Sequence, residues 1–577
     1  MSALIERSRL RALAILSLAV FAAYGSSLRS KAFIYDDQDL IADNPFLHEG
    51  AAGILPALSQ GYWESVYGQD AKVQEYRPVL MLSFLAQTFL TGFSVPAMRL
   101  GNILLHLLVC WLLWEILRRK ISPEAALAGA LIYAVMPVHS EAVELLTGRS
   151  EVLSAAFLLS AWLCLEKETA GGLAMGTALY GLAVLTKESS VLFPIFMALN
   201  DWVFLRRKPW QERSRASQLA LWAATAAALA PRFLALSAPF HGGIPYFHGR
   251  LVAGLTMAKF GLEHYLWPSV TGTGLCTDYS RPLIADSNPA SSAAWLILLA
   301  VASAYALAAW EIARRRSRWA FWLLAPCLFL LPTSHLIIPL DTLGAERFLY
   351  LPTLSLAAGW GFLYWKARQA APRLAFAALI CICVVYALLL SQRNRIWASP
   401  LNFDRAAISC NPASAPAWDG LGSDLISEGR ASQGAAALNR AASLNPNLAD
   451  PYYNMARLEF SRGETVKAAG LLQEALRRDP QSPDAWILLG LCGERGHKDA
   501  AALSDFKTAA RIDPGSPLAQ FNAGRLCLVL SDFDCTRRHW GNYLRLAPQE
   551  PQAAAVRAWL SRLNEGKGIP RAADKRN

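Results

Sequence analysis

The chain has 577 residues, of which 54% are hydrophobic and only 17% are charged. Soluble domains usually carry about a quarter charged residues, so this composition argues against disorder and against an ordinary soluble enzyme. The formal net charge is +11. However, the basic residues form short clusters between apolar segments, which is typical of membrane-orientation signals and not of a nucleic-acid surface. No two of the ten cysteines have the CxxC spacing of a zinc ribbon.

The chain changes character near residue 391. Before that point, apolar stretches of about 20 residues follow one another, and each is long enough to cross about 30 Å of hydrocarbon. We therefore predict an all-α protein whose residues 1–390 form a polytopic, membrane-embedded helix bundle of about eleven spans. The predicted spans are 10–28, 99–117, 123–138, 145–165, 171–186, 189–205, 216–236, 293–312, 319–338, 346–365 and 372–390.

Lysines and arginines predict the orientation of these spans. Basic clusters follow the second, sixth and eighth spans and separate the last two, so all fall on one side if the N-terminus is cytoplasmic. Eleven spans then place everything after residue 390 on the outer side. Residues 78–92 and 251–270 are also apolar, and we interpret both as helices lying at the outer surface. If only one of them crosses, the C-terminal region becomes cytoplasmic.

A 34-residue period dominates the rest of the chain. It is marked by Asn411-Pro412, Asn445-Pro446, Asp479-Pro480, Asp513-Pro514 and Ala547-Pro548. This is the period of the tetratricopeptide repeat (TPR), a helical hairpin that stacks into a solenoid. We predict a junction and half-repeat at 391–414, four repeats at 415–548, and a capping helix and tail at 549–577.

The solenoid has two interpretations. Its concave surface either binds a peptide or protein, which we favour, or acts as a spacer. Cys527 and Cys535 could form a disulfide between two of its helices if the compartment is oxidising.

An acidic pair follows the first span. Asp36 and Asp37 lie in the first predicted outer loop, where one carboxylate could accept a proton from an attacking hydroxyl and the other could raise its pKa or orient it. The alternative is a solvated loop with a helix cap, because Asp is common in caps and turns.

Other polar residues occur near the predicted outer ends of the spans. His139 with Glu141 either helps to ligate a metal, for which two ligands are too few, or contributes to an internal ion pair. Lys187 either holds a phosphate or extends to the membrane surface. The remaining candidates for substrate binding are Arg77, Arg149, Arg347 and Tyr350, the last two sharing one helical face.

Carboxylates and cations at one depth suit a reaction between a membrane-borne donor and an aqueous acceptor. Arginine and lysine would neutralise a lipid phosphate leaving group, and a carboxylate would deprotonate the acceptor hydroxyl. The sequence has no P-loop, GxSxG or dinucleotide fingerprint in the right context, so ATP-driven transport, serine hydrolysis and dinucleotide redox chemistry lack support.

The order of several motifs resembles the transmembrane and tetratricopeptide-repeat O-mannosyltransferase family, within the type C glycosyltransferase superfamily. The motifs are FIYDDQDLIADNP, EYRPVLMLSF, GNILLH, MPVHSEAVELLTGRSEVL, LTKES, TDYS and ERFLYLP, followed by the repeats. The resemblance implies a polyprenyl- or dolichyl-phosphate sugar donor and inverting transfer to a hydroxyl. It also implies that Asp36 or Asp37 is the base and that Arg347 and Lys187 are candidates for binding the phosphate.

The leading hypothesis is therefore an integral-membrane glycosyltransferase that moves a mannose-like sugar from a polyprenyl phosphate to a protein hydroxyl. The expected partners are the lipid-linked sugar, the membrane and a protein or peptide acceptor bound by the repeats, without nucleic acid; no cofactor is certain, and a divalent metal is an open option. The Ala-, Leu- and Arg-rich composition favours a bacterial inner membrane, with site and repeats in the periplasm. The alternatives are a non-catalytic membrane-anchored repeat scaffold and transfer to a lipid or glycan.

Overall fold

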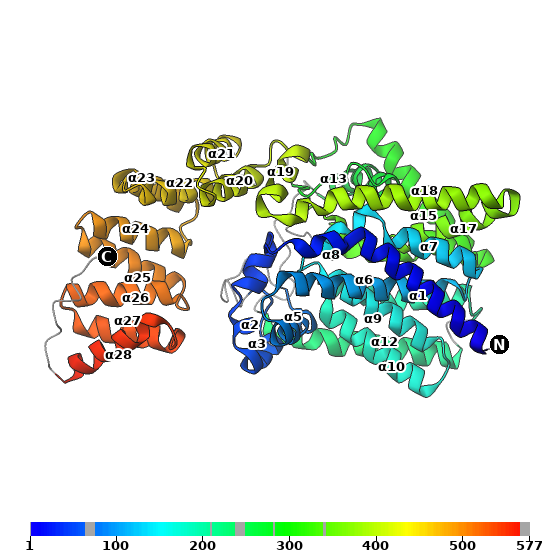
Figure 1. Ribbon diagram of the computed structural model, residues 1–577, viewed down its shortest axis with the longest axis horizontal. Helices are drawn as coiled ribbons and strands as arrows, with labels where there is room; N and C mark the ends of the chain where they lie inside the picture. Colours follow the sequence, from blue (N-terminus) through cyan, green and yellow to red (C-terminus); the bar gives the residue numbers. More distant parts are fainter. Residues whose placement is uncertain are drawn as a thin grey trace. The chain divides into compact units, whose positions relative to one another are not determined.

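The computed structural model describes residues 2–63, 75–207, 211–236, 249–280, 283–337 and 342–565. These residues divide into two compact units, Met1–Pro412 and Ala413–Asn577. Every regular element within the described ranges is a helix (Figure 1), which confirms the predicted all-α class.

The first unit begins with a long helix and a run of short ones. Its helices up to residue 203 are α1 (Ser2–Tyr24), η1 (Gly25–Arg29), η2 (Gln38–Ala42), α2 (Pro45–His48), η3 (Gly50–Gly53), α3 (Ile54–Ser59), α5 (Pro78–Thr91), α6 (Val95–Leu117), α7 (Pro123–Ala134), η4 (Pro137–His139), α8 (Ser140–Glu144), α9 (Arg149–Leu165), α10 (Ala170–Thr186), η5 (Glu188–Leu192) and α11 (Phe193–Val203).

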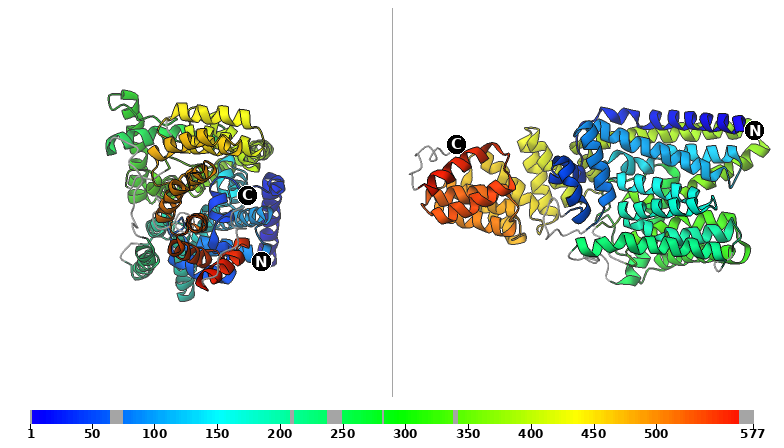
Figure 2. Two further views of the ribbon diagram at one scale, coloured as in Figure 1. Left: turned by 90° about the vertical axis from the view of Figure 1, so that its left-hand side faces the viewer. Right: turned by 90° about the horizontal axis from the view of Figure 1, so that it is seen from below.

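The remainder of the first unit continues this pattern. It contains α12 (Glu212–Ala235), α13 (Arg250–Phe260), η6 (Gly261–Leu266), α14 (Trp267–Thr271), α15 (Ser292–Arg315), α16 (Arg318–Leu324), η7 (Pro326–Thr333), η8 (Glu346–Leu349), α17 (Leu354–Ala370), α18 (Pro372–Asn394), η9 (Ile396–Ala398) and α19 (Pro400–Cys410). The long helices lie side by side: α9 packs against α6 and α10, and α10 packs against α12 (Figure 2).

Four helical segments in the described residues are long and apolar enough to cross a membrane. They are Arg9–Arg29, Val95–Leu117, Ser292–Arg315 and Pro372–Asn394, and the bent pair Pro123–Ala134 and Pro137–Glu144 is a fifth if it forms one span. All eleven predicted stretches contain helix, but several are divided or shortened, as where α7 ends at Ala134 and Pro137 begins η4. The count of eleven stays a prediction, as does the surface placement of α5 and of α13 to α14.

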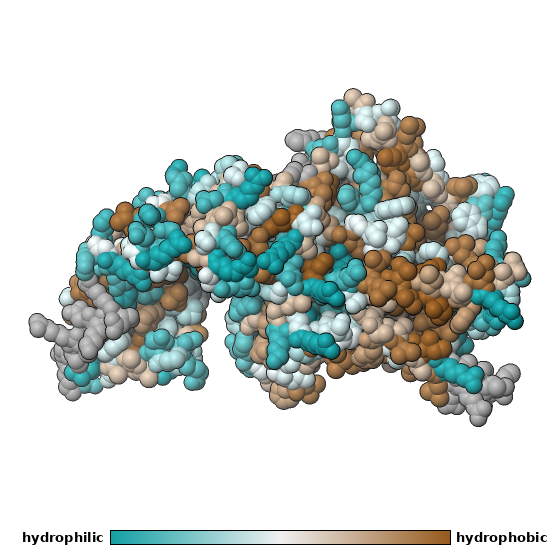
Figure 3. All heavy atoms as spheres, turned by 45° about the horizontal axis from the view of Figure 1, so that its top comes forward, coloured by the Kyte–Doolittle hydropathy of each residue, from teal (hydrophilic) through white to brown (hydrophobic). Residues whose placement is uncertain are grey.

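The surface of the first unit carries many exposed apolar side chains. Leu296 on α15 and Leu374 on α18 are 67% and 70% exposed. Hydrophobic residues gather on the face of this unit shown in Figure 3. A soluble protein rarely exposes such large apolar patches, and a bilayer would cover them.

Small residues bring α7 and α17 into contact. A Cβ atom added at Gly129 would overlap the carbonyl oxygen of Ala357, and one at Gly361 would overlap that of Ala125. Glycine therefore permits the close backbone approach that is common between membrane helices. The contact fixes α17 just after η8, which carries part of the candidate site.

The second unit is a series of helical hairpins. Its helices are α20 (Ala415–Ser427), α21 (Ala431–Leu444), α22 (Asp450–Ser461), α23 (Thr465–Arg478), α24 (Pro483–Arg495), α25 (Asp499–Ile512), α26 (Pro517–Val529), α27 (Phe533–Leu546) and α28 (Pro551–Asn564). The hairpins follow the 34-residue period of the sequence. A Cβ atom at Gly490 would clash with the Phe506 ring, as the repeat requires of a small residue on one helix facing a large one on the next.

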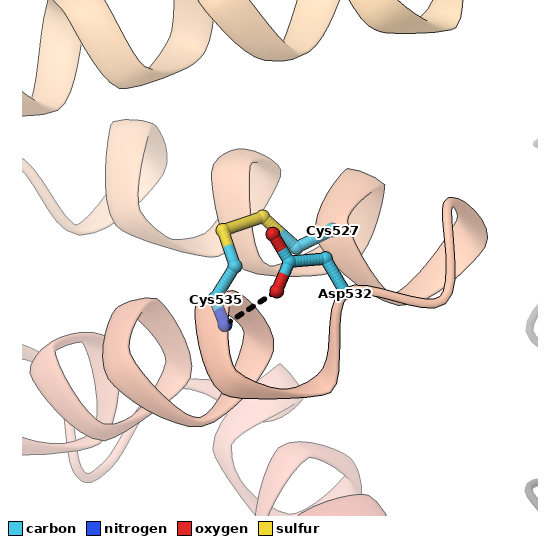
Figure 4. Close-up of side chains that lie close together, drawn as sticks. All are labelled: Cys527, Asp532 and Cys535. Atoms are coloured by element: carbon cyan, nitrogen blue, oxygen red, sulfur yellow. Dashed lines mark hydrogen bonds between the residues drawn. A yellow bond between two sulfur atoms is a disulfide. The ribbon is translucent and has the colours of Figure 1, made fainter.

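The last complete hairpin of this unit is closed by a disulfide. Cys527 on α26 and Cys535 on α27 are bonded, as the spacing allowed, and the side chain of Asp532 accepts a hydrogen bond of 3.0 Å from the backbone N–H of Cys535 (Figure 4). Asp532 is therefore the N-cap of α27.

Candidate active site

The two adjacent aspartates have different environments. Asp37 is fully buried, and its two carboxylate oxygens accept hydrogen bonds from the backbone N–H groups of Leu146 and Thr147, at 3.0 and 2.9 Å. Burial raises the pKa of Asp37 to about 6, although these hydrogen bonds oppose the rise. Asp37 thus fixes the turn that leads into α9.

Asp36 is partly exposed and lies among charged side chains. Burial raises its pKa to about 7, the positive charge of Arg347 opposes the rise, and the carboxylates of Asp37, Glu75 and Glu141 add to it. The preceding residue, Tyr35, has a left-handed φ of 54°. Such a backbone is uncommon outside glycine, and here it lies directly before the two diverging aspartates.

Arg347 is bound to α8 through both its backbone and its side chain. Its Nη1 atom lies 2.7 Å from Oε1 of Glu141, and its backbone N–H donates to Oε2 of the same residue at 3.0 Å. The side chain of Arg347 keeps 20% of its surface exposed. Among the described residues, the guanidinium makes this one hydrogen bond, so other donors of its five remain for a ligand.

Arg77 forms a second cationic group at the start of α5. Its Nη2 atom lies 2.8 Å from Glu75, and its Nε atom lies 3.3 Å from Glu188. Glu188 also pairs with Arg232 of α12, at 2.8 Å. Segments far apart in the sequence are thereby connected by partly exposed ion pairs.

Lys187 lies within electrostatic reach of both Arg77 and Arg347. It forms an ion pair with Glu151, and its Nζ atom lies 5.1 Å from the ring centroid of Phe348, which is 5.7 Å from the guanidinium carbon of Arg347. Burial lowers the pKa of Lys187; Glu151 opposes this effect, and the charges of Arg77 and Arg347 add to it. We call Arg77, Lys187, Arg232 and Arg347 the cation cluster.

His139 and Tyr350 lie outside the cation cluster. Both are fully buried: His139 bonds the carbonyl of Tyr133 at 3.0 Å and the hydroxyl of Thr353 at 2.8 Å, whereas the hydroxyl of Tyr350 bonds His106 at 2.7 Å. Glu141, the suggested partner of His139 at a metal, instead pairs with Arg347. Glu141 was expected to be either a metal ligand or part of an internal ion pair, and the structure shows the ion pair.

No metal-ligand group of three or more His, Cys, Asp or Glu side chains includes His139 within the described ranges. The group found there consists of Cys527, Asp532 and Cys535, two of which form the disulfide of Figure 4. A disulfide sulfur is not a thiolate, so this group lacks the ligands that zinc prefers.

Arg149 also lies outside the cation cluster. Its buried guanidinium donates to the side chains of Asn102 and Gln87 and to the carbonyl of Met98, at 2.7, 2.5 and 3.0 Å. These contacts join α5, α6 and α9. Arg149 therefore acts as a structural clamp that holds these three helices together.

Three arginines that lie outside the sequence motifs also form ion pairs. Arg232 belongs to the cation cluster, Arg99 lies 3.8 Å from Glu144 in a fully buried pair, and Arg393 lies 2.5 Å from Glu346. Each sits inside or at the end of an apolar stretch. A single charge in such a place is costly unless it has a partner, and that signal could have identified them.

The sequence comparisons concern both parts of the chain. Residues 77–234 match the family described as dolichyl-phosphate-mannose-protein mannosyltransferase, and residues 420–483 and 453–517 match the tetratricopeptide repeat. The first match includes Arg77, Glu141 and Lys187, whereas Asp36 and Arg347 lie outside it.

Similar curated proteins share most of the chain at low identity. Protein O-mannosyl-transferase TMTC3 of Mus musculus is 23% identical over 79% of this chain and 54% of its own length. TMTC1 of Homo sapiens is 25% identical over 78% and 57%, and Tmtc1 of Drosophila melanogaster is 25% identical over 79% and 64%. The chain thus spans little more than half the length of these relatives.

Solved structures match smaller parts. The crystal structure of MamA covers 26% of this chain and 88% of its own, with 19% identity and a TM-score of 0.24. That of YrrB, described as a TPR protein with an unusual peptide-binding site, covers 34% and 97%, with 19% identity and a TM-score of 0.25. The chain combines a segment similar to dolichyl-phosphate-mannose-protein mannosyltransferases with tetratricopeptide repeats, and its homologues are protein O-mannosyl-transferases.

Proposed function

We propose that the protein is an integral-membrane glycosyltransferase that moves a mannose-like sugar from a polyprenyl-phosphate carrier to a hydroxyl of a protein acceptor. The observation that carries the proposal is that Asp36 lies within electrostatic reach of Arg347, which shares the ring of Phe348 with Lys187 of the cation cluster. This arrangement offers a proton acceptor next to groups that can bind a phosphate. The names of the relatives support the choice of mannose and of a protein acceptor.

In the proposed reaction, Asp36 removes the proton from the acceptor hydroxyl as that oxygen attacks the anomeric carbon of the sugar. The bond between this carbon and the phosphate oxygen breaks, and its electron pair leaves with the polyprenyl phosphate. Arg347 and Arg77 hold that phosphate, because both keep part of their side chains exposed. The cations thus act where negative charge develops in the transition state.

We assign the candidate active site and the repeats to the outer face of the membrane. The disulfides Cys276–Cys410 and Cys527–Cys535 support this assignment, because such bonds persist in oxidising compartments. In the bacterial inner membrane favoured by the composition, that compartment is the periplasm. The repeats would bind the acceptor protein.

The experiment is a transfer assay with purified protein in vesicles, polyprenyl-phosphate mannose and a hydroxyl-bearing peptide. Wild-type protein should yield mannosylated peptide, and Asp36→Asn should not. No product from the wild type would favour a non-catalytic scaffold. If deletion of residues 415–565 leaves transfer to the protein acceptor intact, the repeats have no role in acceptor binding.

A further inference from the structure

Glu346, the residue directly before Arg347 of the cation cluster, forms an ion pair with Arg393. Their side chains are 2.5 Å apart and only 0% and 9% exposed. A buried ion pair is weak evidence for a contribution to stability, because removing both charges from water is costly. The contacts of the pair show instead which segments it holds in place.

Arg393 connects two segments that both contribute to the site. Its Nη2 atom donates to Oε2 of Glu346, and its Nε atom donates to the hydroxyl of Ser140 at 2.9 Å. Ser140 precedes Glu141, and Glu346 precedes Arg347. Two neighbouring links, Arg393 on one side and the Arg347–Glu141 pair on the other, thus join η8 to α8.

Tyr279 binds the other oxygen of Glu346. The hydroxyl of Tyr279 donates to Oε1 at 3.1 Å and accepts a hydrogen bond from the backbone N–H of Cys276, also at 3.1 Å. Cys276 is bonded to Cys410, the last residue of α19. Glu346 is therefore fixed from two directions, by α18 through Arg393 and by a disulfide-bound loop through Tyr279.

This arrangement matters because η8 is short. A four-residue 3-10 helix has few internal hydrogen bonds and relies on external contacts for its position. A shift of about 1 Å in a group that binds substrate can cost about 100-fold in rate. The residues that hold η8 thus control where the guanidinium of Arg347 lies.

We propose that Glu346 and Arg393, held by Tyr279 and the Cys276–Cys410 disulfide, are positioning residues that set Arg347 against the phosphate of the lipid-linked donor. The proposal rests on the proposed function, since it assigns the phosphate to Arg347. Glu346 and Arg393 act through Arg347 and do not themselves touch the donor.

The test is a double-mutant cycle in the transfer assay with the full chain. In the wild-type background, Glu346→Gln should raise the donor KM and lower kcat/KM by about 10- to 100-fold. In the Arg347→Lys background, where the fork of the guanidinium is already lost, the same change should cost less than about 3-fold. Equal losses in the two backgrounds would overturn the proposal.

A matched control comes from another buried ion pair. Glu166 lies 2.5 Å from Lys120, with side chains 9% and 6% exposed, and within the described ranges no hydrogen bond or ion pair joins either residue to the cation cluster. Glu166→Gln should leave the donor KM unchanged. If Glu346→Gln and Glu166→Gln have the same effect on the donor KM, the loss is a general cost of breaking a buried pair and the proposal is wrong.

Two milder changes keep the proposal testable if Glu346→Gln fails to fold. Tyr279→Phe removes one hydroxyl and should raise the donor KM. The double change Cys276→Ser/Cys410→Ser should do the same, whereas Cys527→Ser/Cys535→Ser should not. An unchanged donor KM in Tyr279→Phe would overturn the proposal. Turnover that survives in Asp36→Asn would refute the proposed function instead, so the two failures are distinguishable.

Discussion

Replacing Asp36 with Asn removes the proposed proton acceptor but keeps the shape of the side chain. Loss of a general base typically costs 10²- to 10⁴-fold in rate, so turnover should fall by at least about 100-fold. The matched control is Asp37→Asn, one residue away. Asn can accept from only one of the N–H groups of Leu146 and Thr147, and the other N–H, left unbonded, costs about 1–3 kcal/mol of stability.

The pH dependence gives an independent test of the same reasoning. A base must be deprotonated to act, and burial raises the pKa of Asp36 to about 7. The active fraction should then rise from about a tenth at pH 6 to about nine tenths at pH 8, so turnover should increase about 10-fold over this range.

The effect on stability has the opposite sign. The pKa of Asp36 is raised in the folded protein from its ordinary value of 3.8 to about 7. The ionised carboxyl therefore costs stability as the pH rises from about 4 to 7, and the full cost is present above pH 7. Asp36→Asn removes this cost, so at pH 8 it should melt no lower than the wild type.

Transfer kinetics and thermal unfolding in detergent, measured side by side, check both expectations. The reasoning is refuted if Asp36→Asn keeps more than about a tenth of the wild-type turnover, or if wild-type turnover is flat between pH 6 and pH 8. It is also refuted if Asp37→Asn loses turnover at unchanged melting temperature while Asp36→Asn does not.

Three further predictions follow from the site. Arg347→Lys keeps the charge but loses the planar fork, so the donor KM should rise about 10-fold without a change in melting temperature, as steady-state kinetics would show. Arg149→Met leaves the partners of a buried guanidinium unbonded and should cost at least about 3 kcal/mol in a denaturant titration; a change below about 1 kcal/mol would contradict the clamp. Because arginines and a lysine can neutralise the leaving phosphate, EDTA should not reduce transfer; a loss restored by Mg²⁺ or Mn²⁺ would show that a metal is required.

The repeats were the part of the fold that the sequence predicted best. Their strict period and small residues such as Gly490 leave few ways to stack the helices. The membrane spans were harder, because hydropathy does not show where a proline such as Pro137 bends one apolar stretch into two helices. The domain boundaries proposed from composition stay predictions, although the first compact unit extends through the junction to Pro412.

The candidate site was predictable in its residue types but not in its pairings. The sequence predicted Asp36 and Asp37 as the acidic pair. It did not predict which of them is exposed and which is buried, because the left-handed backbone at Tyr35 is not visible in the sequence. Spacing placed Arg347 and Tyr350 on one helical face, yet η8 ends at Leu349, and the two side chains have different partners. Arg393 was missed because its partner lies 47 residues away in the chain.

The Cys276–Cys410 bond also bears on how the protein is made. Its two cysteines are 134 residues apart, and α15 to α18 lie between them. The bond can form only after α18 has been inserted and Cys410 has reached the side of the membrane on which Cys276 lies. Oxidation is thus a late event in biogenesis, and non-reducing electrophoresis of newly made chains would separate those that have finished insertion from those that have not.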